Sequence, residues 1–254
     1  MLDLLTETIN SFTYNGKNSA DMGMIITKKD GLYGKPVPIV EKVDIPGRSP
    51  LIMNNKADPL DNEDFENIEK KYTCHVLPED HQDLEMVTRN IYEWLFASNS
   101  GYKRLEDTYE REFFRMAYLG QKMSVADMAA GMIGKVDISF SCKPWKYAKC
   151  GEKKIELSSA GKIYNMYGFT AKPYIKIFGS GNVSLIINNR QHAFQGISEY
   201  IEVDSELMSA FKGLTPQNNK MVSQLFPKLT AGENEIEWTG NITKIEIIPR
   251  WCCL

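Results

Sequence analysis

The chain has 254 residues, of which 43% are hydrophobic and 25% are charged, and its formal net charge is -3. These proportions are ordinary for a folded protein, and the length is enough for two domains that each bury a core. Because phosphate binding needs Lys and Arg clustered on one face, this charge balance excludes specific nucleic-acid binding as an expected function.

The N-terminal stretch Met1 to Phe12 lacks the positive charge and the sustained apolar core of a secretory signal. No apolar run approaches the ~18–20 residues that would span a membrane, so we expect a protein made and kept in a cytosol, without membrane insertion. The cysteines are odd in number and lack C-x-x-C spacing, which predicts reduced thiols and no structural metal. They are Cys74, Cys142, Cys150, Cys252 and Cys253.

Short extended segments open the chain. Asn15-Gly16 is a hairpin turn signal between an aromatic pair, Phe12 and Tyr14, and the apolar run from Met22 to Ile26. The segment from Pro36 to Arg48 alternates apolar and polar residues, but its prolines favour an edge strand or a projecting arm. The polar stretch Met53 to Asp64 predicts a loop, and Lys71 to Val76 predicts a strand.

One long helix is expected at about residues 80–98. Its apolar residues recur at helical spacing, Asp80 is the predicted N-cap, and Gly101 lies beyond the end. We interpret the stripe as core, since nothing marks it as a cofactor site. The stripe consists of Leu84, Val87, Ile91, Trp94 and Leu95.

The segment Tyr102 to Leu119 fits a helix or a strand, and we predict strand because of its Thr-Tyr and Phe-Phe pairs. Its carboxylates predict a solvated charged face, because nothing nearby in sequence supplies a desolvating pocket or a nucleophile. These are Glu106, Asp107, Glu110 and Glu112. Ser124 to Gly134 is rich in Ala, Met and Gly and predicts a loop or a short helix.

The segment Lys135 to Trp145 alternates strictly, with Val136, Ile138, Phe140 and Cys142 on one side, and Pro144 ends it. Strand-like segments dominate after it, whereas the long helix precedes it. We therefore expect it to be the first strand of a C-terminal domain, with an N-terminal domain at residues 1–134 and a C-terminal domain at residues 135–254.

Beyond Trp145, apolar runs separated by Gly and Asn turns predict an antiparallel β-sandwich or jelly roll. The overall fold class predicted is therefore mainly β, with α+β character in the first half. The expected strands are Lys154–Leu157, Pro173–Phe178, Asn182–Asn188, Gln191–Phe194, Ile197–Val203, Glu235–Thr239 and Ile242–Ile248.

No catalytic constellation is found, and we predict a non-enzyme with no catalytic, cofactor-binding or metal-binding residues and no cofactor. Gly179-Ser180-Gly181 lacks the third glycine and following helix of a dinucleotide loop. Gly31 to Lys35 is too short for a P-loop. Asp204-Ser205-Glu206 lies at a strand end and is interpreted as a turn or cap rather than a catalytic pair.

Several motifs in fixed order nevertheless resemble one family, the distal tail proteins (Dit) of long-tailed phages of Gram-positive bacteria. Each motif alone is a turn glycine or proline among strand residues, but together they run nearly end to end. They are Phe12 to Ile26, Val43 to Arg48, Ile138 to Trp145, Asn165 to Gly181, Ile201 to Glu206, Phe226 to Gly240 and Ile247 to Trp251. Ser49-Pro50 departs from the family pattern, where many relatives carry a glycine.

This resemblance implies a structural hub of the phage tail tip or baseplate. The N-terminal domain would close a homo-hexameric ring, single or stacked, and the C-terminal domain would be a peripheral galectin-like sandwich. The implied partners are the major tail tube protein, the tail-associated lysin or fibre protein, and a receptor-binding protein. The implied location is the virion tail tip, after assembly in the host cytoplasm.

Two alternatives remain at this point. The chain could be a carbohydrate-binding adhesin acting directly in recognition of the host cell wall, which would need an exposed aromatic platform. Trp238 and Trp251 have apolar neighbours in strand-like runs, so we expect them in the core. A tail lysin would need a carboxylate pair in a pocket, and the sequence shows none.

Overall fold

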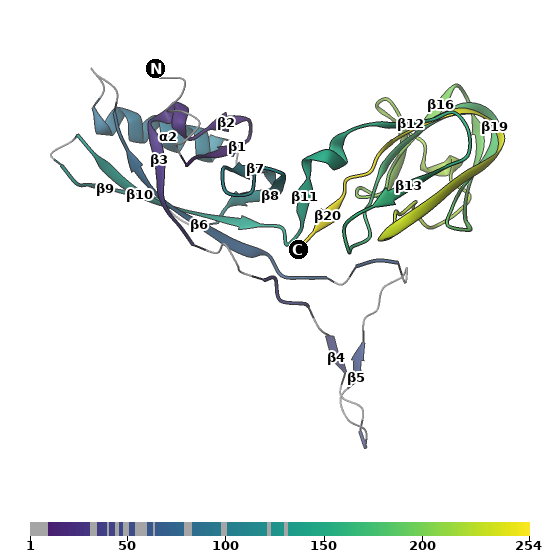
Figure 1. Ribbon diagram of the computed structural model, residues 1–254, viewed down its shortest axis with the longest axis horizontal. Coiled ribbons are helices and arrows are strands. Elements are labelled where there is room, and N and C mark those ends of the chain that lie inside the picture. The colour runs from purple at the N-terminus through teal and green to yellow at the C-terminus, as the bar shows by residue number, and fades with distance from the viewer. Residues whose placement is uncertain are drawn as a thin grey trace. The chain divides into compact units, whose positions relative to one another are not determined.

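The computed structural model describes residues 10–30, 35–39, 41–43, 46–47, 51–53, 60–62, 64–78, 83–97, 101–120, 123–129 and 132–254. The chain divides into two compact units. The first comprises Met1–Ile39, Asp64–Lys146 and Leu254, and the second comprises Val40–Glu63 and Tyr147–Cys253. Antiparallel strands dominate both, as Figure 1 shows, so the predicted mainly-β class is confirmed.

The first unit is built on one antiparallel sheet with the strand order β2-β1-β7-β8-β10-β6-β3, and β9 pairs with β10. Its strands are β1 (Phe12–Tyr14), β2 (Lys17–Asn18), β3 (Met24–Asp30), β6 (Ile68–Val76), β7 (Lys103–Asp107), β8 (Phe113–Leu119), β9 (Ser124–Asp127) and β10 (Gly134–Cys142). The short 3-10 helix η1 (Ala20–Met22) joins β2 to β3.

The predicted turn at Asn15-Gly16 is confirmed. Both residues have positive φ, 50° and 82°, as a two-residue hairpin turn requires, and Tyr14 pairs with Lys17. The hairpin partner is the short β2, however, and not the apolar run that begins at Met22. That run forms β3, which pairs with β6 on the far side of the sheet.

β3 contains a bulge that changes which side chains face inward. Its register against β6 shifts between Ile26, opposite Cys74, and Lys28, opposite Thr73. A bulge inserts one residue and reverses the alternation beyond it. Ile26 is buried before the bulge, and after it the side chain of Lys29 is buried while Lys28 is exposed.

The sheet curls until its two ends approach one another. Asn10, just before β1, accepts a hydrogen bond from the amide of Ile26 in β3, although these strands lie at opposite ends of the strand order. The inward side chains of the curled sheet form one core cluster. This closure allows residues of β3 and β7 to meet inside the unit.

The helix α2 (Leu84–Ala97) contributes its apolar side to this core. Its predicted apolar stripe is confirmed, since Val87, Ile91, Trp94 and Leu95 are all buried in the cluster. The N-cap is Asp83, whose carboxylate accepts the amide of Met86. The predicted cap, Asp80, and the expected start of the helix lie outside the described residues.

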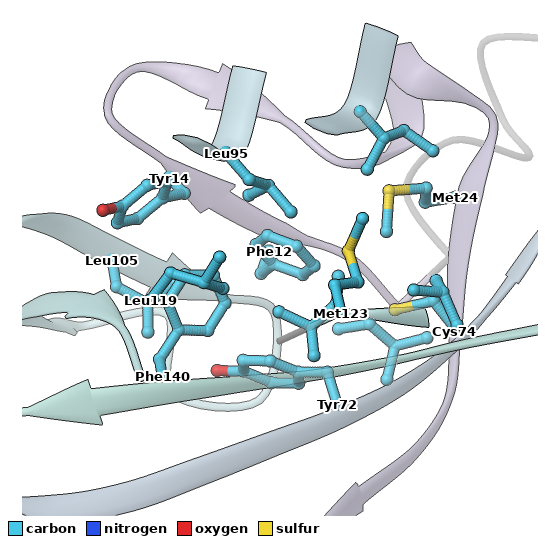
Figure 2. Close-up of a cluster of buried hydrophobic side chains, with 14 of the residues drawn as sticks. Phe12, Tyr14, Met24, Tyr72, Cys74, Leu95, Leu105, Leu119, Met123 and Phe140 are labelled. Atoms are coloured by element: carbon cyan, nitrogen blue, oxygen red, sulfur yellow. The ribbon is translucent and has the colours of Figure 1, made fainter. Parts of the chain in front are cut away.

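Phe12 is the centre of the core. Its ring stacks on Tyr72 at 5.1 Å and on Trp94 at 5.7 Å, and it meets Phe140 edge-on at 5.5 Å. Figure 2 shows Phe12 between Leu95 and Tyr72, so side chains of helix and sheet meet through this ring. The indole of Trp94 also donates to the carbonyl of Tyr14 at 3.2 Å.

The expectation that Lys135 to Trp145 opens the C-terminal sandwich is wrong. The strand alternates as predicted, with Val136, Ile138 and Phe140 buried, and it ends at Cys142 before Pro144. Its ladders, however, are with β6, β8 and β9. The apolar side of this strand therefore completes the core of the first unit, and alternation alone could not tell which core it faces.

Two other expectations for the first unit have different outcomes. The segment Tyr102 to Leu119 is strand, as predicted, and forms the hairpin β7–β8. The segment Ser124 to Gly134 was expected to be a loop or short helix, which is wrong for its first part, because β9 (Ser124–Asp127) pairs with the first half of β10; the described residues that follow β9 form the bend between these two strands. Cross-strand pairing overrides the weak local preference of its Ala and Gly residues.

The predicted arm has extended structure where it is described. In the first unit, Pro38 bridges Phe65, Ile39 donates to Asp64, and the amide of Glu66 donates to Val37; we call residues 37–39 and 64–66 the arm base. Further along the chain, β4 (Glu41–Val43) and β5 (Leu51–Met53) form a two-stranded sheet and, among the described strands, pair with no other. Met53, where the predicted loop was expected to begin, therefore belongs to a strand. Residues 54–59 of that predicted loop lie outside the described residues.

The second unit holds the order β12-β19-β14-β16-β17-β18, with β13 on β19 and β15 on β14. Its strands are β12 (Ile155–Leu157), β13 (Gly161–Asn165), β14 (Tyr174–Ile187), β15 (Arg190–Ile197), β16 (Tyr200–Asp204), β17 (Ser209–Lys212), β18 (Thr215–Pro216) and β19 (Gly232–Ile248). β11 (Lys146–Ala148), which begins at the last residue of the segment Asp64–Lys146 of the first unit, pairs with β20 (Cys252–Cys253) near the chain end. Two 3-10 helices, η2 (Lys149–Glu152) and η3 (Asn218–Lys220), complete it.

The two longest strands, β14 and β19, each replace two of the predicted strands. Their ladder shifts register around Phe178–Gly179 and Ser180–Ser184, where the sequence had predicted a turn. A side chain at Gly179 would meet the carbonyl oxygen of Asn241 at 2.2 Å, so only glycine allows this close approach. The strands therefore bend at these glycines and continue, with β16 pairing before the bend and β15 after it.

Removing the ring of Trp94 should empty a core site. We expect Trp94→Ala to lower the free energy of unfolding by about 3–5 kcal/mol, since the ring stacks on Phe12. Urea denaturation followed by circular dichroism measures it. Exposed Glu93→Ala on the same helix is the control, with an expected change under about 0.5 kcal/mol. Equal effects of the two changes would mean that the helix does not pack on this core.

The place of β10 also predicts how fragments behave. A fragment of residues 1–134 lacks the strand between β6 and β8, so it should lose cooperative unfolding, whereas a fragment of residues 1–146 should keep it. Circular dichroism melts compare the two. A cooperative transition in the shorter fragment would restore the boundary expected from the sequence.

Candidate functional site: a buried charge junction

A cluster of charged side chains is buried around Asp107, the last residue of β7. Its Oδ2 lies 2.9 Å from Nζ of Lys29 and 3.2 Å from Nζ of Lys70, and the hydroxyl of Tyr72 donates to it at 2.7 Å. The side chains of Lys29 and Asp107 are each only 1% exposed. We call Lys29, Lys70, Asp107, Glu110 and Lys146 the charge junction.

The turn after β7 fixes the carboxylate of Asp107. Its Oδ1 accepts the amides of Tyr109 and Glu110, each at 3.0 Å, as aspartate does where a strand turns. Both oxygens are therefore held, one by the backbone of the turn and the other by side chains. The carboxylate cannot rotate without breaking several hydrogen bonds.

The two lysines reach Asp107 for different local reasons. Lys70 belongs to the buried side of β6, which alternates regularly from Ile68 to Val76. Lys29 points inward only because of the bulge that precedes it in β3. The junction thus joins three strands, β3, β6 and β7, two of which lie near opposite ends of the sheet order.

Glu110 extends the junction toward the end of the first unit. It pairs with Lys70 at 3.0 Å and with Lys146 at 2.7 Å, and its side chain is 23% exposed. Lys70 therefore bridges two carboxylates. Lys146 follows the corner at Pro144, so the junction also fixes the chain where it leaves this unit.

Burial and neighbouring charges act in opposite directions on these groups. Burial alone would raise the pKa of Asp107, but Lys70, the Tyr72 hydroxyl and Lys29 lower it below its ordinary value. Burial would likewise raise the pKa of Glu110, yet Lys146 and Lys70 lower it to about 2. Burial and the charge of Lys70 lower the pKa of Lys29.

The expectation of a solvated charged face is thus wrong for Asp107 and Glu110. Glu112 is exposed as expected, and Glu106 pairs with Arg104. Sequence reasoning missed the junction because the two lysines that bind Asp107, Lys29 and Lys70, lie far from it in the chain. The available signal was an aspartate at a strand end with a glutamate three residues later, which is typical of a fixed turn.

Several contacts also fix the corner of the chain at Pro144, which follows β10. The guanidinium of Arg115, a buried residue of β8, donates to the carbonyl of Pro144, and the amide of Lys143 donates to Met116. The ring of Trp145 meets that of Phe65 in the arm base at 5.5 Å, edge-on. The motif that ends in Trp145 is therefore a structural corner.

A second ion pair lies in the second unit and joins two of the motifs. Arg250 and Asp204 form a bidentate pair with distances of 2.7 and 2.8 Å. Asp204 also accepts the amides of Glu206 and Leu207, so the interpretation of this segment as a turn is confirmed. The hydroxyl of Tyr147 donates to Glu206 at 3.2 Å.

The remaining segments considered from the sequence are two glycine-containing turns and two tryptophans. Gly179 and Gly181 lie at the bend of β14, and most of the segment from Gly31 to Lys35 lies outside the described residues. Trp251 is 5% exposed, so its predicted core position is confirmed, whereas Trp238 is half-buried and pairs with buried Leu185.

Metal and membrane features were searched in the parts of the chain that the structure describes. No group of three or more His, Cys, Asp or Glu side chains could hold a metal ion there. None of the helical segments in those parts is long and apolar enough to cross a membrane. Burial raises the pKa of Cys74 and of Cys252 to about 12, which leaves both thiols protonated.

Solved structures with the same architecture are phage tail components. The SPP1 Dit (gp 19.1) protein, described as a paradigm of the hub adsorption apparatus in phages infecting Gram-positive bacteria, aligns with a TM-score of 0.69 at 13% identity, over 97% of this chain and 100% of that one. A chain of the phage P2 baseplate in its activated conformation with Ca aligns with a TM-score of 0.51 at 10% identity, over 94% of this chain and 97% of that one. No family model and no curated protein matches the sequence. The resemblance read from the motifs is confirmed at the level of the fold.

The junction predicts a specific acid sensitivity. The pKa of Glu110 is lowered from 4.5 to about 2, so its ion pairs contribute stability above pH 4.5 that is lost as the pH falls toward 2. We expect Glu110→Gln to cost on the order of 1–3 kcal/mol at pH 6 and to flatten the pH dependence in that window. Urea midpoints at several pH values measure it. Exposed Glu112→Gln is the control, and a Glu110→Gln curve parallel to that of the unaltered protein would contradict the assignment.

Proposed function

We propose that the chain is a structural hub of a phage tail tip, which assembles as a homo-hexameric ring. The observation that carries the proposal is the likeness to the SPP1 Dit protein over essentially the full length of both chains. Likeness across the whole length supports a shared architecture of two units rather than one common domain. A ring built from identical units needs heterologous contacts that close around a rotation axis.

The arm base supports ring closure through the first unit. Val37 and Ile39 are 59% and 60% exposed and alternate along the same side of the paired segment. A two-stranded ribbon is marginally stable by itself and gains stability when its apolar side packs on another surface. We therefore assign this side to contact with the neighbouring subunit.

The second unit would then form the periphery of the ring as a galectin-like domain. The ion pair of Asp204 with Arg250 and the close backbone approach at Gly179 are contacts within this unit, which suits a domain that folds by itself. Exposed apolar residues remain on its surface, including Leu207, Met208 and Leu214. They are suitable contacts for other tail components.

The partners that fit this role are the tail tube protein, the tail-associated lysin or fibre protein and a receptor-binding protein. The location that fits is the virion tail tip, after assembly in the host cytoplasm. Among the described residues, the carboxylates of the junction do not support an enzymatic role. Asp107 and Glu110 are both paired with lysines, whereas a glycosidase needs two carboxyl groups that flank a bound substrate.

A carbohydrate-binding adhesin is the alternative, and one surface favours it. On the outer side of β14 and β16, the rings of Phe178 and Tyr200 lie 6.0 Å apart, and Nζ of Lys176 lies 3.8 Å from the centre of the Tyr200 ring. Such half-exposed rings can stack on sugars. A glycan array on the purified protein tests this function, and binding abolished by Tyr200→Ala would support it.

Mass in solution tests the hub. We expect light scattering after size exclusion to give six times, or for stacked rings twelve times, the chain mass of 28.9 kDa. A monomer at all concentrations would contradict the ring.

The arm base should be required for that assembly. Val37→Glu with Ile39→Glu places two charges on its exposed apolar side, so we expect the hexamer to dissociate while the circular dichroism of the subunit stays unchanged. Val222→Glu is the matched control, because Val222 is 60% exposed in the second unit. A hexamer that survives the double change would place the subunit contact elsewhere.

A further inference from the structure

We propose that Lys29 and Asp107 join to form an intramolecular amide bond, which closes the curled sheet of the first unit covalently. The inference goes beyond the hub function and does not depend on it. It rests on the placement of an amine, a carboxyl group and two sets of hydrogen-bond donors inside the charge junction.

The reacting groups are close and shielded from water. Nζ of Lys29 lies 2.9 Å from Oδ2 of Asp107, and both side chains are 1% exposed. A lysine becomes a nucleophile when it is desolvated or lies beside another cation, and Lys29 meets both conditions, because Lys70 binds the same oxygen. Because the fold already holds the two groups in place, the reaction does not incur the entropy cost of bringing two separate reactants together.

The two carboxyl oxygens have different surroundings, and each fits one role. Oδ1 accepts the backbone amides of Tyr109 and Glu110 at 3.0 Å, which is an arrangement that stabilises negative charge on an oxygen during acyl transfer. Oδ2 is surrounded by Lys29, Lys70 and the Tyr72 hydroxyl, all of which bring protons to it. Oδ2 is therefore the oxygen that leaves.

The reaction needs no co-reactant. The ammonium of Lys29 passes one proton to Oδ2, which leaves a neutral amine and a neutral carboxyl group. The amine attacks Cγ of Asp107, and the charge that develops on Oδ1 is held by the two amides. A second proton from the nitrogen reaches Oδ2 through Lys70, the C–Oδ2 bond breaks, and one water molecule leaves. An ammonium and a carboxylate have become an amide and water.

Burial favours the first step, the proton transfer from Lys29 to Asp107, whereas the low pKa of Asp107 disfavours it. Transfer of the proton within the pair removes two opposite charges from a dry core, which low dielectric favours. Burial and Lys70 lower the pKa of Lys29 in the same direction. The low pKa of Asp107 makes the neutral pair a minor species, so the bond should form gradually after folding.

The amide bond would join two strands, β3 and β7, that are not hydrogen-bonded neighbours in the sheet. β3 is one end of the strand order and β7 lies near the other, so the bond closes a loop that includes the whole arm. A cross-link that closes a long loop restricts the unfolded chain, as a disulfide does. The cysteines are not placed to supply such a link, since Cys74 and Cys142 are separate buried thiols in this unit.

Intact mass under denaturing conditions tests the proposal on the full chain without any variant. We expect protein aged in the folded state to weigh less than its sequence mass by one water molecule, and protein kept in denaturant from the start to have the full mass. A peptide map should contain a branched peptide that joins Lys29 to Asp107. The full sequence mass after long incubation of folded protein would overturn the proposal.

Variants assign the atoms. Lys29→Arg and Asp107→Ala should each restore the full mass, because neither can form the amide. Lys28→Arg is the matched control on the same strand, where Lys28 is exposed and pairs with Asp30, and it should keep the loss of water. Loss of water in Lys29→Arg, or a branched peptide from Lys70, would overturn the assignment to Lys29. A succinimide also loses water, but it joins no peptides and would likewise overturn it.

Discussion

Closure of the first unit depends on the meeting of Lys29 and Lys70 with Asp107. Backbone hydrogen bonds hold each strand to its neighbours in the sheet, whereas β3 and β7 are not paired strands and meet across the interior through these side chains. The carboxylate of Asp107 accepts hydrogen bonds from Lys70, from the Tyr72 hydroxyl and from two backbone amides, and Nζ of Lys29 forms an ion pair with it at 2.9 Å. The curled sheet is therefore stabilised by the buried ion pairs of Asp107 as well as by the apolar core cluster.

The same few residues define where the chain leaves this unit. Lys29 ends the inward side of β3 shortly before the arm, Lys70 follows the return of the arm, and Lys146 ends the unit, bound through Glu110. The Arg115 contacts and the Trp145 ring fix the corner at Pro144 beside the arm base. The proposed hub function would need extensions that start from a rigid body, and these contacts stabilise such a body.

The sequence predicted elements better than it predicted their partners. Period and turn chemistry gave the helix, the Asn15-Gly16 turn and the strand of Val136 and Phe140, because each depends on neighbours in the chain. The sheet to which that strand belongs depends on β6 and β8, which no local pattern identifies. The junction was missed for a related reason. A one-residue bulge reverses the side on which Lys29 lies, and simple alternation places Lys28 there instead.

The motifs that resemble the family contain residues with structural roles, which explains why the resemblance predicts the fold and not the binding partners. Asp204 and Arg250, from two separate motifs, form a single ion pair, while Gly179 permits a backbone contact and Trp251 is buried. Such residues specify how the chain packs on itself, and the match to the SPP1 Dit protein at 13% identity is likewise a match of the fold. Residues that choose a partner lie on the surface and are free to change. Proteins of one architecture can therefore share a frame and bind different components, and the exposed apolar side chains of Val37, Ile39 and Leu214 are positions at which we expect this chain to make contacts of its own.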